Sequence, residues 1–383
     1  MTAIKSYVPI LRWRTAEMLA LEHLYPQDRE AITPFIEFIM PPPKTDKNDR
    51  KKILEDPKSK FLRLLPDIGK RLLKYCGRSA MFLDVHLLDG DIRASIFENI
   101  LSSANAIDLF SVPVVHIIPV VGTDADMATR QVAVKYAKIG NRGLCIRIAN
   151  SHLKNDDLAE HIENFIKDNS LDIKKVDILV DLEIVDQSIT ADSVIEKFSH
   201  IPQIDKCRSF ILSGGAFPKD LSKLQKFENH QLERTDWKLW HEIINSKKLV
   251  RKPIFSDYTI QHPIFYGYIP GASVSASVRY TNSDKWEIFR GEALHYIKKN
   301  GEKGPGYKQY LAHAQEIIKQ PFYKKADYSF GDSEINRIAT PNNDKTGNPQ
   351  IWLTIGINHH LTLVARQTAN PREKPTKHSS HNP

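Results

Sequence analysis

Short hydrophobic segments rich in β-branched residues recur along the first two thirds of the chain. Near-continuous apolar segments of this kind are typical of strands in parallel sheets that are covered on both faces. Hydrophobic positions at helical spacing lie between them, as in residues 15–24, 61–75, 126–139, 156–168 and 189–200. The strands are predicted at residues 8–13, 33–37, 80–84, 112–118, 143–148, 176–182, 208–213 and 253–257.

The spacing of these strands favours a barrel. Successive strands begin about 26 to 46 residues apart, and a strand with its crossover helix needs roughly 30 residues or more. Eight such units match an α/β fold of the (β/α)8, TIM-like type better than an open sheet. The glycine patterns GxGxxG and GxxxxGK[ST], which mark nucleotide-binding open sheets, do not occur in the sequence.

The pattern changes after the eighth strand. Residues 272–281 alternate, residues 282–284 can turn and residues 286–291 return, which predicts a β-hairpin, and a helix is expected over 307–318. Gly347-Asn-Pro349 supplies an N-cap and an N1 proline for a last helix that closes the barrel. The predicted units are a barrel body (1–262) with an exposed loop or short helix at 40–60, an inserted hairpin and helical cap (263–346), a C-terminal helix (347–367) and a disordered basic tail (368–383).

Composition places the chain among globular proteins. Of its 383 residues, 41% are hydrophobic and 26% are charged. No apolar stretch is long enough to span a membrane, and the N-terminus lacks the features of a signal peptide, so we expect a cytoplasmic protein without membrane contact. Three widely spaced cysteines suit neither a disulfide framework nor a zinc ribbon.

The formal charge of +8 suggests an anionic partner. The excess is not in the barrel body, because residues 41–60 carry seven basic and four acidic side chains, and the insertion and the tail are also net basic. This distribution weakens a nucleic-acid interpretation of the total charge. It is compatible with a weakly basic rim around an acidic mouth.

Active sites of such barrels lie at the carboxyl ends of the strands. Polar side chains end most of the predicted strands, which is more than an apolar core requires. They are Arg12 and Trp13 on the first strand, Glu37 on the second, Asp84 and His86 on the third, Arg147 on the fifth, Asp181 and Glu183 on the sixth, Ser213 and Gly214 on the seventh, and Asp257 on the eighth.

Two of these strand ends carry paired groups two residues apart, so both members of a pair point to the same side. Asp84, His86, Asp181 and Glu183 are the predicted catalytic residues, as acid–base groups. Together with Glu37, the three carboxylates Asp84, Asp181 and Glu183 also form a predicted set of ligands for a divalent metal such as Mg²⁺ or Mn²⁺. The alternative is a hydrogen-bonded polar layer that closes the barrel, and no metal motif such as HExxH is present.

An anionic substrate has several predicted contacts. Arg12 and Arg147 can clamp a phosphate or carboxylate, although ion pairs with Glu37 and Asp181 explain them equally well. Backbone N–H groups at Ser213 and Gly214 offer an anion site, with a simple glycine turn as the alternative. Trp13, Asp257 and Arg279, which is on the predicted hairpin, complete the substrate-binding set.

Two adjacent histidines, His359 and His360, lie in the last predicted helix. Neighbouring helical residues point about 100° apart, so the two rings cannot easily ligate one metal. We expect one ring to pack inward and the other to face solvent or the cap.

Several sequence blocks resemble the beta-protein family, which is named after a bacteriophage protein. The resemblance spans residues 7 to about 367, and the basic tail lies outside it. It implies a setting of phage–host conflict or antiviral defence, and it implies no particular activity. The blocks are Tyr7-Val-Pro-Ile-Leu-Arg-Trp13, Thr33-Pro-Phe-Ile-Glu37, Phe82-Leu-Asp84, Leu212-Ser-Gly-Gly-Ala-Phe-Pro218, Phe255-Ser-Asp-Tyr258, Ser329-Phe-Gly-Asp332, Gly347-Asn-Pro349 and Trp352-Leu-Thr-Ile-Gly-Ile-Asn-His-His-Leu361.

Three functional hypotheses follow. The first is a metal-dependent hydrolase of a phosphorylated or nucleotide-like substrate at the barrel mouth. The second is a non-catalytic binding protein that recognises a phage or host macromolecule through the 40–60 loop, the hairpin and the tail. The third is sequence-independent nucleic-acid binding by the basic elements, which requires an affinity that falls steeply with salt.

Overall fold

The computed structural model describes residues 3–46, 52–105, 115–269, 274–297, 301–341 and 344–369. Parts of the predicted 40–60 loop, of the fourth strand and of the hairpin lie outside these ranges, and so does nearly all of the predicted tail.

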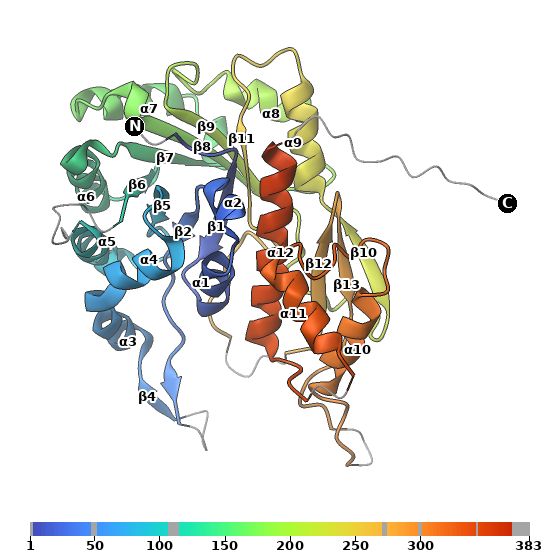
Figure 1. Ribbon diagram of the computed structural model, residues 1–383. Coiled ribbons are helices and arrows are strands. Elements are labelled where there is room, and N and C mark those ends of the chain that lie inside the picture. Colours follow the sequence, from blue (N-terminus) through green and yellow to red (C-terminus); the bar gives the residue numbers. More distant parts are fainter. Residues whose placement is uncertain are drawn as a thin grey trace.

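Eight parallel strands close into a barrel in chain order, which confirms the predicted α/β, TIM-like fold (Figure 1). The fourth strand begins at Ile117, several residues later than predicted. The strands are β1 (Tyr7–Arg12), β2 (Phe35–Glu37), β5 (Met81–Asp84), β6 (Ile117–Gly122), β7 (Leu144–Ala149), β8 (Val176–Ile184), β9 (Ser209–Gly215) and β11 (Ile254–Asp257).

Helices cover the outside of the barrel (Figure 1). The single helix predicted at 61–75 is two helices, because Pro66 lacks the N–H that a continuous helix needs and a 3-10 turn replaces it. The helices of the barrel are α1 (Thr15–Glu22), α2 (Pro26–Glu30), α3 (Pro57–Leu64), α4 (Ile68–Cys76), α5 (Gly90–Ala104), α6 (Met127–Lys138), α7 (Leu158–Asp168), α8 (Ala191–Phe198) and α9 (Thr235–Asn245).

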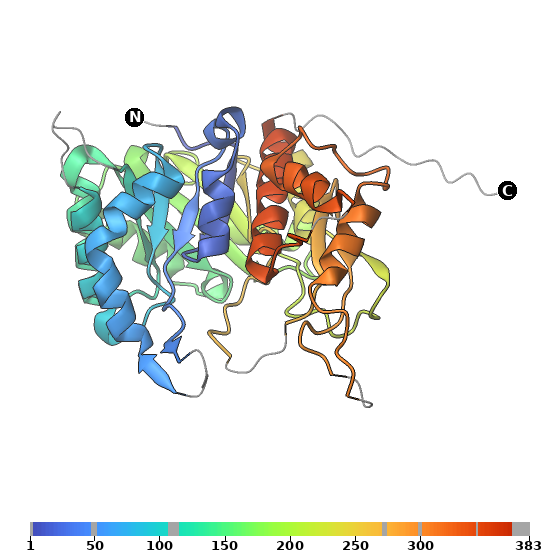
Figure 2. The same ribbon diagram turned by 60° about the horizontal axis from the view of Figure 1, so that its bottom comes forward.

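A short hairpin occupies part of the segment predicted as a loop. It consists of β3 (Lys44–Thr45) and β4 (Ile53–Glu55), and it projects from the side of the barrel at which the strands end (Figures 1 and 2).

The inserted hairpin is present as β12 (Val278–Asn282) and β13 (Lys285–Phe289). A third strand, β10 (Asn229–Glu233), pairs with β13 and comes from the connection between β9 and α9. The sequence did not predict β10, because its residues are mostly polar and largely exposed. The insertion also contains α10 (Lys308–Ile317) and α11 (Phe330–Ala339). Its sheet therefore includes a strand from the barrel body, and the domain boundaries at 262, 346 and 367 stay predictions.

The last helix, α12 (Pro349–Ala369), lies between the barrel and the inserted sheet and contacts α1, α11 and β12 (Figures 1 and 2). Asn348 Oδ1 accepts a hydrogen bond from the Ile351 N–H at 3.0 Å, so the predicted N-cap is confirmed. Residues all around the helix are buried, because α12 packs into two cores at once. Ile357, Leu361 and Val364 belong to the core between barrel and helices, and Trp352 and Ile355 to the core of the insertion.

Both histidines of α12 are fully buried, so neither ring faces solvent, and His359 faces the inserted cap, which was the other expected alternative. His360 Nε2 lies 2.9 Å from Asp257 Oδ2, and its Nδ1 lies 2.8 Å from Thr281 Oγ1. His359 lies 2.7 Å from Asp332 and 2.8 Å from the Thr281 carbonyl. The two rings point in different directions, and both are buried because α12 is covered on both sides. His360 joins the barrel to the inserted sheet, and His359 joins α12 to the insertion.

The side chains of each barrel strand alternate between two cores. Inward residues form an apolar plug in the barrel, and outward residues pack under the helices. Among the described residues, no helix combines the length and apolar character needed to cross a bilayer.

Candidate functional site at the carboxyl-terminal mouth of the barrel

A polar layer lies above the apolar plug at the carboxyl ends of the strands. Each of its residues follows an inward apolar residue of the same strand by two positions, so it also points inward. The layer consists of Arg12 on β1, Glu37 on β2, Asp84 on β5, Arg147 on β7, Asp181 on β8, Ser213 on β9 and Ser256 on β11, all at most 8% exposed.

Arg147 is the centre of this layer. Its Nη1 donates to Glu37 Oε1 at 2.9 Å and to Asp84 Oδ2 at 2.8 Å. Nε and Nη2 both donate to Asp181 Oδ2, at 3.1 and 2.5 Å, and Nη2 also lies 2.9 Å from the hydroxyl of Tyr258. The guanidinium therefore joins four strands, and three of the four predicted metal ligands converge on it.

The cluster is stable in its ionised form. Burial favours neutral groups, but the negative charges of Asp181, Glu37 and Asp84 outweigh it and raise the pKa of Arg147 well above its ordinary value. Burial also acts against the charge of Asp84, where His86 and Arg147 prevail and hold the pKa well below its usual range. Asp84 therefore stays a carboxylate at every physiological pH.

The carboxylates around Arg147 are not arranged as ligands of a divalent metal. The point at which Glu37, Asp84 and Asp181 meet holds a guanidinium, so a metal ion bound there would have to displace Arg147. Within the described ranges, no group of three or more His, Cys, Asp or Glu side chains has a metal-binding arrangement. The three carboxylates thus surround the Arg147 guanidinium in the place where a metal ion would bind. The Mg²⁺ or Mn²⁺ site stays a prediction that this geometry does not favour.

At three strand ends, an aspartate side chain accepts a hydrogen bond from the backbone N–H two residues later. The carboxylate of Asp84 accepts the backbone N–H of His86 at 2.9 Å, and Asp181 accepts that of Glu183 at 2.9 Å. Asp257 accepts the N–H of Thr259 at 3.0 Å. An aspartate that binds the N–H two residues later competes with strand pairing and turns the chain. The Asp-x-His and Asp-x-Glu spacing therefore places the second residue of each pair at the rim.

Glu183 sits in a strained conformation at this rim. Its φ is 57°, a region that L-residues rarely adopt, and the register of β8 against β9 shifts between Asp181 and Ile184. Partial burial and the nearby charge of Asp181 raise the pKa of Glu183, with Arg147 opposing them. A half-buried carboxyl with a raised pKa can hold a proton closer to neutral pH than an ordinary glutamate.

His86 lies beside Asp84 and Arg147 at the rim. Its Nδ1 lies 3.0 Å from Arg147 Nη1 and 3.1 Å from Asp84 Oδ2. Arg147 Nη1 has only two protons, and the shorter contacts to Glu37 and Asp84 use both. A neutral ring with its proton on Nδ1 would direct that proton toward Asp84. Nε2 lies 3.4 Å from Arg147 Nη1 and 3.7 Å from Glu37 Oε1, on a side chain that is 37% exposed.

The opposite arc of the mouth contains buried polar atoms without partners. Among the described residues, no hydrogen bond reaches Glu37 Oε2, Arg12 Nε, Ser256 Oγ or Ser213 Oγ. These atoms belong to β2, β1, β11 and β9, which are consecutive around the barrel. Buried polar atoms in native proteins normally have partners, so this arc is suited to ordered water or a polar ligand.

The comparison with protein families agrees with these positions. The family model described as Beta protein matches residues 7–366, which include every strand of the barrel and the polar layer. The chain belongs to the Beta protein family. The resemblance seen in the sequence is thereby confirmed, while no curated protein matches the chain.

Other predicted site residues of this Beta protein lie apart from the Arg147 cluster. Asp257 points outward, where it accepts hydrogen bonds from Tyr7 at 2.7 Å and pairs with His360. Trp13 is partly exposed and stacks on Phe38 with ring centroids 5.0 Å apart. These two positions follow the outward side of their strands, whereas the residues of the layer follow the inward side.

The contacts of Arg279 and Gly214 stabilise the fold. Arg279 donates to the Ile260 carbonyl at 2.9 Å, and burial lowers its pKa to about 10. A Cβ on Gly214 would lie 2.5 Å from a methyl carbon of Val185, so this glycine permits close packing beside β9. Arg12 Nη2 donates to the carbonyls of His262 and Pro263, at 3.0 and 2.5 Å, which fixes the segment after β11 over the mouth.

Sequence reasoning left Tyr258 out of the site. Its hydroxyl donates to Asp181 Oδ2 at 2.6 Å and accepts from Arg147. The available signal was its position two residues after Ser256, which puts both side chains on the inward side of the chain. Ser256 was not among the predicted site residues either.

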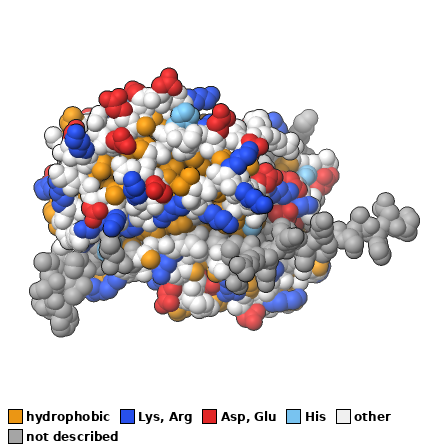
Figure 3. Space-filling view, turned by 90° about the horizontal axis from the view of Figure 1, so that it is seen from above, with side chains coloured by type: hydrophobic (Ala, Val, Ile, Leu, Met, Phe, Trp, Pro, Cys, Tyr) orange, Lys and Arg blue, Asp and Glu red, His pale blue; other side chains and the backbone are white. Residues whose placement is uncertain are grey.

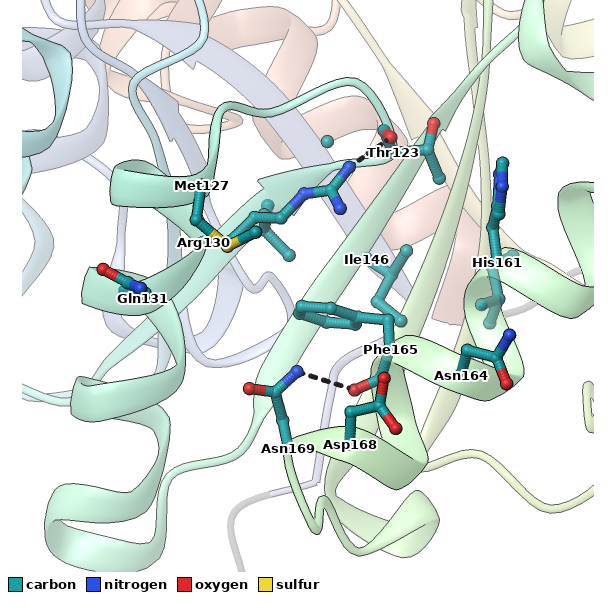
Figure 4. A pocket seen from close by; sticks show the side chains of 13 residues that line it. Thr123, Met127, Arg130, Gln131, Ile146, His161, Asn164, Phe165, Asp168 and Asn169 are labelled. Atoms are coloured by element: carbon teal, nitrogen blue, oxygen red, sulfur yellow. Dashed lines mark hydrogen bonds between the residues drawn. The ribbon is translucent and has the colours of Figure 1, made fainter.

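Another cavity lies outside the barrel. It encloses about 500 Å³ between α6 and α7, against the outward residues Val121 and Ile146 (Figure 4). Arg130 points across it and donates to the Thr123 carbonyl at 2.7 Å. The amino-terminal face of the molecule shows acidic and basic side chains intermixed around hydrophobic ones (Figure 3). Neither surface combines charged groups as the carboxyl-terminal mouth does.

Proposed function

We propose that this Beta protein is a hydrolase whose barrel mouth acts by general acid–base catalysis on a small polar substrate. The observation that carries the proposal is the orientation of His86. Its Nδ1 lies 3.1 Å from the buried carboxylate of Asp84, which is the arrangement of a catalytic histidine and its orienting carboxylate, and Nε2 is the proton acceptor that we propose.

The proposed reaction uses two rim residues. His86 Nε2 takes a proton from a water molecule as its oxygen attacks the scissile centre, and protonated Glu183 gives its proton to the leaving group. The raised pKa of Glu183 supports the second role, because a proton donor must be protonated before the reaction. A proton returned from His86 to Glu183 through water restores both groups. Arg147 is a positioning residue, since its donors are engaged by protein acceptors.

The polar arc supplies the proposed binding half of the site. Arg12 Nε and the hydroxyls of Ser213 and Ser256 have no hydrogen-bond partner among the described residues, and Arg12 is a cation whose Nε lies 3.6 Å from Glu37 Oε2. This combination favours an anionic substrate such as a phosphate ester or a nucleotide-like molecule. A cytoplasmic role in phage–host conflict is the biological setting that we propose with it.

The test measures hydrolysis of bis(p-nitrophenyl) phosphate and p-nitrophenyl phosphate by the full chain. Removal of a general base or acid typically costs 10²- to 10⁴-fold, so His86→Asn and Glu183→Gln should each lower the rate at least 100-fold. Glu55→Gln, on the exposed hairpin, is the matched control and should leave the rate unchanged. A wild-type rate no higher than that of His86→Asn on both esters would refute the proposal. Activity that requires added Mn²⁺ would instead favour the metal-dependent form.

A second candidate function is the binding of a macromolecule at the rim. Three segments project from the mouth side of the molecule (Figure 2), and they carry exposed apolar side chains. These include Ile53 and Leu54 on β4, Tyr268 and Ile269 after β11, and Ile297 in the insertion, all at least 51% exposed. Consecutive exposed apolar residues, as at Ile53 and Leu54 and at Tyr268 and Ile269, favour an interaction site.

The two functions respond to different substitutions. A phage or host partner bound at the rim should be lost with Tyr268→Ser/Ile269→Ser and retained with His86→Asn, as measured by affinity purification from infected cells. Retention by the rim variant would exclude this surface as the interface. A partner lost only with His86→Asn would assign the interaction to the mouth.

A further inference from the structure

A second cavity lies beside the mouth, on the outer side of β1 and β2. It encloses about 440 Å³ between α1, α3, α4 and the beginning of α12. Small-molecule sites in proteins typically enclose roughly 300–1,000 Å³. None of the residues in the proposed reaction lines it, so this cavity is independent of the proposed function.

The walls of this cavity are largely apolar. Trp13, Phe61 and Leu353 contribute side chains from three separate parts of the chain, and Pro41 and Pro42 add rigid surface. Trp13 and Leu353 are only partly buried and pack at the edge of the main core. A flat hydrophobic group fits such walls, because it would replace water over apolar surface on several sides.

The charged residues of the lining all have one sign. Arg14, Lys60 and Arg71 line the cavity, and none of its described lining residues is Asp or Glu. Glu17 neutralises Arg14 through contacts of 2.8 to 3.2 Å. Lys60 donates to the Pro42 carbonyl at 2.8 Å, and Arg71 lies 5.4 Å from the ring centre of Trp13. No ion pair with a described carboxylate compensates either Lys60 or Arg71.

Two helices begin at the cavity and add positive potential. Thr15 and Ala16 come from the first turn of α1, which has no side-chain N-cap. Pro349 and Gln350 come from the first turn of α12, which is 21 residues long. A helix N-terminus favours an anion, so the two helix ends reinforce the two uncompensated cations.

We infer that this cavity binds a small amphipathic anion, with its flat apolar body against Trp13, Phe61 and Leu353 and its acidic head at Arg71. A carboxylate, sulfonate or phosphate supplies the same charge and acceptor oxygens, so the head group is defined by its chemistry. Arg71 can donate two parallel hydrogen bonds to any of them.

A pair of dyes tests both halves of the inference with the full chain. 8-Anilinonaphthalene-1-sulfonate has the proposed shape and charge, and N-phenyl-1-naphthylamine has the same rings without the charge. Fluorescence titration should show saturable binding of the sulfonate. Arg71→Gln should weaken that binding about tenfold, which is the size of one charge-assisted contact, and should leave the neutral dye unaffected. Lys70→Gln, the preceding and exposed residue on α4, is the control and should change neither dissociation constant.

Leu353→Trp, which fills the cavity, should weaken both dyes, whereas Ile351→Trp at a partly exposed position of the same helix should not. Circular dichroism verifies that each variant is folded. The inference is overturned if the sulfonate does not saturate, if Lys70→Gln weakens it as much as Arg71→Gln, or if Leu353→Trp leaves it unchanged. His86→Asn should have no effect on dye binding, so failure of the proposed hydrolase and failure of this site are distinguishable.

Discussion

Single residues at the mouth have roles that depend on their neighbours in space. Arg147 was predicted as a substrate clamp or as a partner of Glu37 and Asp181. The structure shows the ion pairs, and it adds Asp84 and Tyr258. One guanidinium thus contacts three buried carboxylates, and Arg12 adds a second cation 3.6 Å from Glu37.

Loss of this guanidinium should destabilise the fold strongly. Arg147→Met leaves three carboxylates buried without their cation, and we expect the free energy of unfolding to fall by about 3–5 kcal/mol. Urea denaturation gives this value. Arg63→Met removes a solvent-screened surface pair with Glu55 and serves as the control, with little or no expected loss. Equal losses in the two variants would show that the central cluster contributes no more than a surface pair.

A second buried carboxyl should make stability depend on pH. Among the described residues, the Asp236 carboxyl has no hydrogen-bond partner, and burial raises its pKa from 3.8 to about 7, with Arg234 opposing and Asp257 adding to the rise. The folded state therefore holds this proton more tightly than the unfolded state, and stability should decrease as pH rises from about 4 to 7. The shift corresponds to at most about 4 kcal/mol.

Asp236→Asn removes this ionisation. The variant should match the wild type near pH 4 and should exceed it in unfolding free energy at pH 8. A variant that is less stable than the wild type at pH 8 would show that the ionised carboxylate is stabilised in the fold.

At the scale of elements, the crossing of α11 and α12 depends on close backbone approach. A Cβ on Gly331 would lie 2.4 Å from the Ile355 carbonyl oxygen, which belongs to a helix backbone and cannot move by itself. The nearby contact between the Gly331 N–H and Asn358 Oδ1, at 2.9 Å, holds the same crossing.

Gly331→Ala should therefore separate the helices and cost about 1–3 kcal/mol in the free energy of unfolding. Gly90→Ala is the matched control, because nothing lies within 4 Å of the added Cβ and alanine favours the helix α5. Thermal and urea unfolding of both variants measure the difference. If Gly331→Ala is as stable as Gly90→Ala, the two helices are not in close backbone contact.

Elements also show what the sequence could and could not predict. The barrel strands were visible because their inward and outward residues are both apolar, and the strand ends gave the members of the polar layer. β10 was missed because a polar edge strand has no hydrophobic signal, and α11 because its short apolar pattern is interrupted by polar residues. The pairing of Arg147 with Asp84 and Glu37 follows from barrel closure, which brings β7 opposite β2 and β5, and no spacing along the chain encodes it.

At the scale of the molecule, two cores share the helix α12. The barrel is joined to the insertion through this helix, through the His360–Asp257 and His359–Asp332 pairs, and through β10. The proposed acid–base site and the proposed anion cavity both lie on the carboxyl-terminal side of this assembly. The central claim is that the fold presents His86 there as a base oriented by Asp84.

The most direct measurement is the tautomer of His86, because it needs no substrate. A long-range ¹H–¹⁵N correlation spectrum links the carbon-bound ring protons to the two ring nitrogens. Recorded at alkaline pH and assigned with His86→Asn, it identifies which nitrogen carries the proton. The account predicts a proton on Nδ1 and an unprotonated Nε2. A neutral His86 ring with its proton on Nε2 would contradict it.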